Sequence, residues 1–275
     1  MNDSYALIGY PLGHSLSPQI HTKLFELAGI KAHYELKEIK PEELKNGYDY
    51  LRTFTGFNIT IPHKIPIIDF CSELSEGAKR YGSVNCIKNE NGKSIGYNTD
   101  VLGFVKSIEQ LDASLNSRVC LLGCGGVGRM MAIEAAHQGA ELTMAVRTED
   151  IPVAEGIKSE IEKALPKSKV NVINLQEMKG GYDLVINATP VGMYPKTDFS
   201  PLAKEQLDGV KYLFDAIYNP IETLLSKYAK ESGVKVSTGM AMLVLQAVAA
   251  HEIWNGSEYR QSDIKALISE MEKQV

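Results

Sequence analysis

The stretch Val119-Cys120-Leu121-Leu122-Gly123-Cys124-Gly125-Gly126-Val127-Gly128 decides the fold of the second half of this chain. A short apolar run of the kind that forms a buried strand leads directly into a GxGGxG turn, and apolar residues at helical spacing follow it. In such a strand–turn–helix unit, glycines allow the backbone to approach a pyrophosphate at the positively polarised start of a helix. The stretch predicts a nucleotide-binding turn; a tight turn with only a structural role is the alternative.

The alternation of strands and helices continues after this turn. Strands that alternate with helices are typical of a parallel sheet with right-handed crossovers. We therefore predict an α/β protein in which residues 102–237 form a Rossmann-like, doubly wound nucleotide-binding domain. Its further strands are predicted at Glu141–Val146, Val170–Leu175, Leu184–Asn187, Tyr212–Ala216 and Val234–Ser237.

The residues before this domain carry a different pattern of strands, helices and turns. Ser17-Pro18 is predicted to start a helix that ends at Gly29, with the Ser17 hydroxyl as its cap, and Asn91-Gly92 is a hairpin signal. The change of pattern falls in a helix over Asp100–Leu111, which places a domain boundary there. The other predicted elements are the strands Tyr5–Gly9, His33–Ile39, Phe57–Ile61, Ser83–Lys88 and Lys93–Tyr97, and helices over Pro41–Phe54 and Met240–Trp254 and from Ser262.

The composition restricts the possible functions. The chain has 275 residues, which suits two domains, and its 44% hydrophobic and 23% charged content is that of a folded protein. A net charge of −5 without a basic stripe gives no reason to expect a nucleic-acid partner. Four scattered cysteines form no metal-binding pattern and are expected to be reduced thiols. Neither a membrane span nor a signal peptide is evident, so we expect a cytoplasmic protein without bound metal.

An arginine at the end of the second strand of the nucleotide-binding half bears on cofactor choice. At this place an acidic side chain favours the ribose hydroxyl of NAD, and an arginine favours the 2′-phosphate of NADP. The chain has Val146-Arg147-Thr148, followed by Glu149 and Asp150. Arg147 therefore predicts NADP. If it is a solvated arginine instead, NAD is possible.

Four residues in the first half could carry chemistry. Ser15 and Ser17 lie at a predicted helix start, where hydroxyls and free backbone N–H groups can bind an anion, although Ser17 could simply cap the helix and Ser15 lie in a loop. Lys64 follows Pro62 at the end of a strand, a place that can present a side chain to a ligand. Asp100 begins a helix. On their own, Lys64 could be a solvated lysine and Asp100 a helix-stabilising carboxylate.

A set of ordered segments resolves these alternatives. The sequence resembles the shikimate dehydrogenase family over essentially its whole length, with the motifs in the family's order and at its approximate spacing. The segments that carry the resemblance are Gly9–Pro18, Asn58–Lys64, Gly82–Asn85, Gly96–Asp100, Gly123–Gly128, Asn187–Met193, Asp215–Pro220 and Gly239–Gln246.

The resemblance implies a fold and a reaction. It implies an N-terminal α/β substrate domain over residues 1–101, which the C-terminal helices 238–275 join, beside the nucleotide-binding domain. It also implies the reversible NADP-dependent reduction of 3-dehydroshikimate to shikimate, a step in aromatic amino-acid biosynthesis. The expected partners are these small molecules, with the protein acting as a monomer or homodimer.

The resemblance also assigns roles to residues by position. Lys64 and Asp100 would be the catalytic pair. The sequence leaves open which of the two transfers the proton; we assign it to Lys64, with Asp100 as the orienting partner. The substrate-binding residues would be Ser15 and Ser17 at the carboxylate, Thr60, Asn85 and Gln246 at the ring hydroxyls together with Asp100, and Tyr218 nearby. The cofactor-binding residues would be Gly123, Gly125, Gly126, Val127, Gly128, Arg147, Ala216 and Gly239.

The chain departs from the family pattern at a few positions. Val146 replaces the asparagine that usually precedes the arginine, and Ile151 lies near the place of a second arginine. The chain therefore has fewer side chains than usual to bind the 2′-phosphate of NADP. Gly128 stands where an alanine is common, and His251 where an aromatic residue is usual. Two other functions therefore stay open. One is a quinate/shikimate dehydrogenase that uses NAD, against which Ser17 argues because relatives that accept quinate often carry threonine there. The other is a non-catalytic metabolite-binding homologue.

Overall fold

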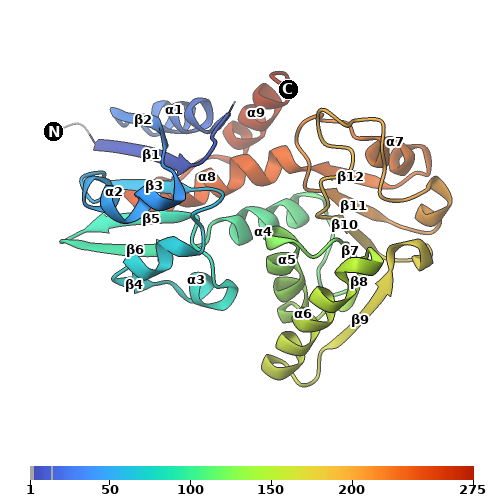
Figure 1. The fold of residues 1–275 in the computed structure, drawn as a ribbon. Coiled ribbons are helices and arrows are strands. Elements are labelled where there is room, and N and C mark those ends of the chain that lie inside the picture. Colours follow the sequence, from blue (N-terminus) through green and yellow to red (C-terminus); the bar gives the residue numbers. More distant parts are fainter. Residues whose placement is uncertain (1–2, 14) are drawn as a thin grey trace. The chain divides into compact units, whose positions relative to one another are not determined.

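The computed structural model describes residues 3–13 and 15–275, so that His14, within the segment Gly9–Pro18, lies outside the described residues. Contacts within the chain divide it into two units. One unit comprises the chain up to Gly103 together with Leu243–Met271, and the other comprises Phe104–Met242 with the last residues of the chain. Figure 1 labels the elements of both.

The first unit is built on a mixed six-stranded sheet. Its strands are β1 (Asp3–Gly9), β2 (Ala32–Glu38), β3 (Gly56–Ile59), β4 (Glu73–Leu74), β5 (Cys86–Glu90) and β6 (Lys93–Tyr97). They lie in the order β2-β1-β3-β5-β6-β4 (Figure 1). Strands β1, β2 and β3 are parallel, whereas β5 is antiparallel to both of its neighbours. The predicted hairpin at Asn91-Gly92 is confirmed, with φ of 51° and 75° at its two turn residues, as a type I′ turn requires.

Helices cover both faces of this sheet. They are α1 (Ser17–Ala28), α2 (Leu44–Leu51), α3 (Glu76–Tyr81), α8 (Gly239–Asn255) and α9 (Gln261–Glu272), with short 3₁₀ turns η1 (Pro41–Glu43) and η2 (Pro66–Phe70). Successive side chains of a strand point to opposite faces. Ala6 and Ile8 of β1 accordingly pack with α2 and α3, and Tyr5 and Leu7 pack with α1 and α8. The last turns of α8 thus complete the core of the first unit.

Two local predictions in this unit need correction. Ser17 is not the cap of α1: it is the first helical residue, Leu16 precedes it as the cap, and no side chain caps the helix. The Ile20 N–H donates to the Leu16 carbonyl at 3.0 Å, so the helix begins one residue earlier than predicted. The predicted end is confirmed, because Gly29 adopts φ 68° as its left-handed C-cap. The helix predicted over Pro41–Phe54 is a 3₁₀ turn followed by the shorter α2.

The second unit is built on a six-stranded parallel sheet, as predicted. Its strands are β7 (Arg118–Leu122), β8 (Glu141–Val146), β9 (Lys169–Asn174), β10 (Leu184–Asn187), β11 (Tyr212–Asp215) and β12 (Lys235–Thr238). Their order is β12-β11-β10-β7-β8-β9, the doubly wound order of a Rossmann fold. The chain leaves the adjacent strands β7 and β10 in opposite directions. Ligands bind at such a point, outside the carboxyl ends of the strands.

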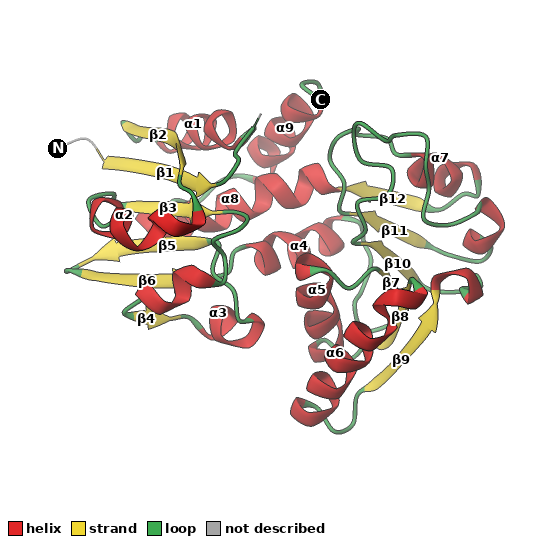
Figure 2. Ribbon diagram, in the orientation of Figure 1, coloured by secondary structure: helices red, strands yellow, loops and turns green. Residues whose placement is uncertain are grey.

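Helices and long loops connect these strands. The helices are α4 (Asp100–Gln110), which enters the unit, α5 (Gly126–His137), α6 (Ile151–Ala164) and α7 (Leu224–Glu231), with 3₁₀ turns η3 (Thr148–Asp150), η4 (Leu175–Glu177) and η5 (Lys204–Leu207). Most of the connection from β10 to β11 is loop, coloured green in Figure 2. Among the described helices, none has the length and apolar character needed to cross a membrane.

Candidate functional site

Lys64 and Asp100 form an ion pair in the first unit. The Lys64 Nζ lies 2.6 Å from the Asp100 Oδ2, and the side chains are 27% and 17% exposed. Partial burial strengthens their attraction while leaving both groups open to a ligand. A lysine held in this way can donate a proton to an oxygen, and the carboxylate beside it can orient a hydroxyl.

Backbone bonds fix both members of this pair. Lys64 follows the end of β3, and its carbonyl accepts a hydrogen bond from the Val84 N–H at 2.8 Å. Asp100 is the first residue of α4, and the side chain of Asn98, two residues earlier, accepts from the Val101 N–H at 3.2 Å. The start of a helix stabilises a carboxylate through its free N–H groups and its dipole. Hydrogen bonds of the neighbouring chain therefore help to hold Lys64 and Asp100 in place.

Asn85 and Gln246 are linked to the pair through Thr99. The Asn85 Oδ1 accepts from the Thr99 N–H at 2.6 Å, and its Nδ2 donates to the Thr99 Oγ1 at 3.0 Å. The Thr99 hydroxyl also lies 3.4 Å from the Gln246 Oε1. Thr99 is fully buried and directly precedes Asp100. The structure thus brings Lys64, Asp100, Asn85 and Gln246 into one connected group.

The remaining predicted substrate residues lie at strand and helix ends. Ser15 and Ser17 are half-buried and contact each other at the start of α1. Thr60 follows β3, and its N–H donates to the Ile8 carbonyl at 2.9 Å. A Cβ on Gly9 would lie 2.4 Å from the Thr60 Cγ2, so only glycine permits this approach of the two strand ends. Tyr218 belongs to the second unit, where it follows β11 with 37% of its surface exposed.

The glycine turn of the second unit has the shape that a pyrophosphate needs. Gly125 caps α5, and the first N–H groups of the helix lack intrahelical acceptors. A Cβ on Gly125 or Gly126 would meet no heavy atom within 4 Å, so the surface above these residues is open. A Cβ on Gly128 would lie 2.5 Å from the Gly123 carbonyl oxygen, so this glycine serves close packing of the turn against the helix. The predicted turn therefore fits a dinucleotide.

Arg147 follows β8 and is already engaged by its acidic neighbours. Its Nε donates to the Asp150 Oδ2 at 2.8 Å, and its Nη1 lies 3.1 Å from the Glu149 Oε1. The hydrogen bond to Asp150, together with the charges of both acids, raises the pKa of the guanidinium. The side chain is 65% exposed, so solvent screens these pairs and a phosphate can compete for them.

Ala216 and Gly239 lie against each other beyond the ends of β11 and β12. The Gly239 N–H donates to the Ile217 carbonyl at 3.0 Å, and a Cβ on Gly239 would lie 2.1 Å from the Ala216 carbonyl oxygen. Glycine is thus required at the start of α8. The two predicted nicotinamide-side residues form one rigid backbone surface.

Sequence reasoning named no role for two buried polar groups near these residues. Thr99 belongs to the segment Gly96–Asp100 and directly precedes Asp100. That position is the one sequence feature that could have indicated a role for it. Asp215 lay within the quoted segment Asp215–Pro220 and is 0% exposed. Burial raises the pKa of its carboxyl, although four hydrogen bonds act in the opposite direction. Neither burial nor bonding partners could be read from local sequence.

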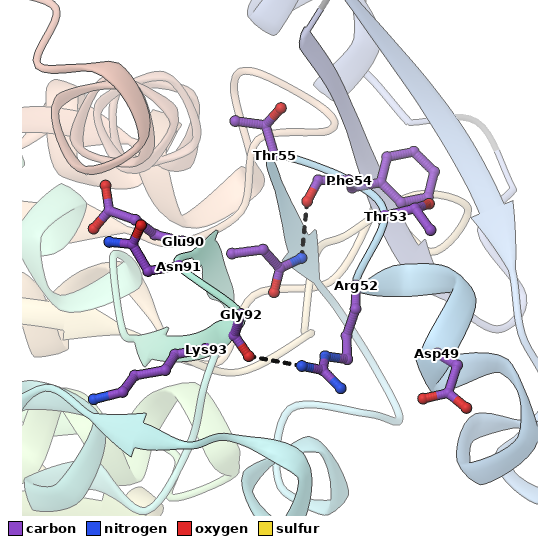
Figure 3. Close-up of a pocket in the computed structure, with 10 residues that line it drawn as sticks. Asp49, Arg52, Thr53, Phe54, Thr55, Glu90, Asn91, Gly92 and Lys93 are labelled. Atoms are coloured by element: carbon purple, nitrogen blue, oxygen red, sulfur yellow. Dashed lines mark hydrogen bonds between the residues drawn. The ribbon is translucent and has the colours of Figure 1, made fainter.

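A separate hollow of about 460 Å³ lies between the β5–β6 hairpin and the end of α2, and Figure 3 shows its lining. Two of its polar side chains already bond to backbone carbonyls of the lining: Arg52 Nη2 donates to the Gly92 carbonyl at 2.6 Å, and Asn89 Nδ2 donates to the Phe54 carbonyl at 2.9 Å (Figure 3). We therefore assign it no ligand. Within the described ranges, no group of three or more His, Cys, Asp or Glu side chains could hold a metal ion.

Comparisons with known proteins bear on the family and the fold of this chain. Residues 7–87 match the family model for the shikimate dehydrogenase substrate binding domain. A shikimate dehydrogenase (NADP(+)) of Caldanaerobacter subterraneus is 37% identical over 260 residues, which cover 92% of this chain and 91% of the relative. The crystal structure of a shikimate dehydrogenase in complex with NADP+ superposes with a TM-score of 0.91 at 36% identity, covering 98% of this chain and 96% of that one. The Thermus thermophilus shikimate 5-dehydrogenase in complex with NADP(H) and shikimate gives a TM-score of 0.87 at 29% identity, with coverages of 98% and 99%.

Proposed function

The chain belongs to the shikimate dehydrogenase family, and we propose that it catalyses the reversible NADP-dependent reduction of 3-dehydroshikimate to shikimate. The observation that carries this proposal is the 2.6 Å pair of Lys64 and Asp100, in a chain of which 92% aligns with an NADP-dependent shikimate dehydrogenase. The enzyme is an oxidoreductase of the shikimate pathway, which leads to aromatic amino acids.

The first unit supplies the group that donates the proton. Reduction of a ketone needs a proton on the developing alkoxide, and the Lys64 ammonium is the donor that we assign to it. Asp100 accepts a hydrogen bond from the substrate hydroxyl and holds Lys64 in place. Asn85 and Gln246, linked through Thr99, contact the other ring hydroxyls together with Thr60.

The carboxylate of the substrate is assigned to Ser15 and Ser17. Ser17 is the first helical residue of α1, so its hydroxyl is released from the capping role that the sequence predicted. An anion at the start of a helix also gains from the free N–H groups there. Tyr218 is assigned to the substrate by the resemblance.

The cofactor is assigned to the second unit. Its pyrophosphate is held by the N–H groups of the Gly123–Gly128 turn, with Val127 and the open surface at Gly125 and Gly126 beside it. Arg147 meets the 2′-phosphate of NADP, and Ala216 and Gly239 line the nicotinamide side. When bound, the cofactor supplies the hydride. The side chains of the protein orient the reacting groups and manage the proton.

Three further properties belong to the proposal. The substrate domain comprises residues 1–101 and the C-terminal helices 238–275, and residues 102–237 form the nucleotide-binding domain; the two compact units support this division. The enzyme acts in the cytoplasm. It is a monomer or a homodimer.

NAD is the second candidate cofactor, and one observation favours it. Both acidic neighbours of Arg147 contact its guanidinium, and they would lie close to a 2′-phosphate bound there. The test is to measure the absorbance change during shikimate oxidation with NADP+ and NAD+ in parallel, with quinate as a second substrate. If the folded protein oxidises shikimate with neither cofactor, the proposed activity is refuted. The chain would then be a metabolite-binding homologue.

A further inference from the structure

Asp215 is a buried carboxylate that takes no part in the proposed chemistry. It is the last residue of β11, at the carboxyl ends of the strands of the second sheet, where the cofactor is assigned. It is 0% exposed. A carboxylate in such a place is costly unless donors satisfy it. The groups that face it come from three elements and are all donors.

The four donors reach Asp215 from β10, from the residues after β11, and from the start of α7. Its Oδ1 accepts from the Asn187 Nδ2 at 2.9 Å and from the Ile217 N–H at 3.1 Å. Its Oδ2 accepts from the Thr223 Oγ1 at 2.6 Å and from the Ser226 Oγ at 3.4 Å. Thr223 also caps α7 by accepting from the Ser226 N–H.

Through Asn187 the carboxylate reaches the glycine turn. The Asn187 Oδ1 accepts from the Thr189 N–H at 3.0 Å and from the Thr189 Oγ1 at 2.7 Å. A Cβ on Gly123 would lie 2.8 Å from the Thr189 Cγ2, so Thr189 abuts the first glycine of the turn. The orientation of the Asn187 amide therefore sets the position of Thr189 against Gly123.

Through Ile217 the carboxylate reaches the predicted nicotinamide side. The Ile217 N–H is held by Asp215, and the Ile217 carbonyl accepts from the Gly239 N–H at 3.0 Å. The Ala216 N–H donates to the Asn187 carbonyl at 2.9 Å. One carboxylate thus links the pyrophosphate turn and the Ala216–Gly239 surface.

We propose that Asp215 is a positioning residue that sets the cofactor site of this enzyme by orienting Asn187 and the Ala216–Ile217 backbone together. The inference rests on the proposed function, because that function places the cofactor at this edge. Only a carboxylate can do this. It offers two acceptor oxygens to four donors, whereas an amide offers one oxygen and turns N–H groups toward the donors on its other side. In a buried site such a mismatch is expensive, so the neighbours would shift.

The test compares Asp215→Asn with the parent enzyme. We expect the Kd of NADP+, measured by titration calorimetry, to rise at least about tenfold, because a charge-assisted network is broken. The Kd of shikimate should stay within about twofold, and kcat should fall because the nicotinamide side is displaced. A carboxylate with only a structural role would lower the melting temperature and leave the Kd of NADP+ unchanged.

A second pair of variants keeps the test decisive if Asp215→Asn does not fold. Thr223→Val removes the hydroxyl that donates at 2.6 Å, and Thr223→Ser keeps it. We expect Thr223→Val to weaken NADP+ binding in the same direction and Thr223→Ser to match the parent. Equal NADP+ affinity of all three proteins would overturn the proposal. A parent enzyme that binds NADP+ and shikimate but does not turn over would refute the proposed activity instead, and the binding comparison would still decide the role of Asp215.

Discussion

The His21 Nδ1 lies 3.0 Å from the His251 Nε2, and both rings are 0% exposed in the core of the first unit. The second nitrogen of His251 lies 2.7 Å from the Tyr259 hydroxyl, which donates to the Leu24 carbonyl at 3.1 Å. His251 stands where the family usually has an aromatic residue. It retains an aromatic contact, with its ring centroid 4.3 Å from that of Phe25, and adds a polar link between α1 and α8.

These contacts assign the protons of the two rings. Because the Tyr259 hydroxyl donates to Leu24, it must accept from His251 Nδ1–H, which leaves His251 Nε2 to accept from His21 Nδ1–H. Both rings are therefore neutral. Burial lowers the pKa of His251 to about 3, and burial together with His251 lowers the pKa of His21 well below its usual value.

Acid should therefore destabilise the folded protein before its carboxylates are protonated. In the unfolded chain these histidines take up protons below about pH 6.5, whereas in the folded protein His251 does so only near pH 3 and the pKa of His21 lies well below its usual value. The two histidines therefore make their full contribution to the free energy of unfolding above about pH 6.5. This contribution is lost as the pH falls, by up to about 1.4 kcal/mol per pH unit for each histidine. His251→Phe should flatten this slope in urea unfolding measured from pH 7 to pH 4. Parallel curves for the parent and His251→Phe would contradict the assignment.

Lys64→Ala should lower kcat by roughly 10²–10⁴-fold, the usual effect of losing a general acid–base. Shikimate binding should change little, because the hydroxyl and carboxylate contacts remain. Initial rates and shikimate titration check the two parts. Lys79→Ala, which removes an exposed ion-paired lysine, is the matched control. Activity within a few-fold of the parent would return Lys64 to the role of a solvated lysine.

Ser17→Ala should raise the KM of shikimate without lowering the melting temperature. A carboxylate contact persists from the ground state to the transition state, so its loss acts on KM rather than kcat. The Ser17 side chain does not cap α1, so no capping energy is lost. Ser15→Ala should raise KM in the same way. A fall in kcat at constant KM would argue against the carboxylate assignment.

The glycine turn offers two variants with opposite effects. Gly126→Ala meets no protein atom within 4 Å, so stability should hold while the KM of NADP+ rises, because the methyl group occupies the surface that a pyrophosphate approaches. Gly128→Ala would place its Cβ 2.5 Å from the Gly123 carbonyl oxygen, so the turn must shift, at a cost of about 1–3 kcal/mol. Thermal melts and cofactor kinetics on both variants separate the two effects. The reverse pattern would show that the open surface is not the pyrophosphate side.

Arg147 should give a preference for NADP of roughly ten- to a hundredfold, the range expected of one charge-assisted phosphate contact. The preference should fall with salt, because the side chain is 65% exposed. Arg147→Ala should remove it and leave NAD turnover nearly intact. Glu149→Gln should increase it, since a competing carboxylate 3.1 Å from the guanidinium is neutralised. Equal kcat/KM values with both cofactors in the parent enzyme would show that Arg147 does not contact the phosphate.

Local sequence predicted most of the second unit because its patterns act over short distances. A buried strand, a glycine turn and a helix follow one another within a few residues, so β7 and α5 could be predicted nearly to the residue. The hairpin at Asn91-Gly92 was predictable for the same reason, since those two residue types suit positive φ. The predicted start of α1 was wrong because the Ile20 N–H donates to the Leu16 carbonyl, which makes Leu16 the cap and Ser17 the first helical residue.

The sequence by itself determined the α/β class, the order of strands and turns, and the residue types that a dehydrogenase needs. Only the tertiary structure decided which of those residues meet. Lys64 and Asp100 are 36 positions apart, Thr99 and Gln246 are 147 apart, and His21 and His251 are 230 apart. Contacts over such separations follow from the sheet order and from how α8 packs into the first core, and local propensity carries no information about either. The burial of Asp215 arose in the same way, from three elements that converge on one strand end.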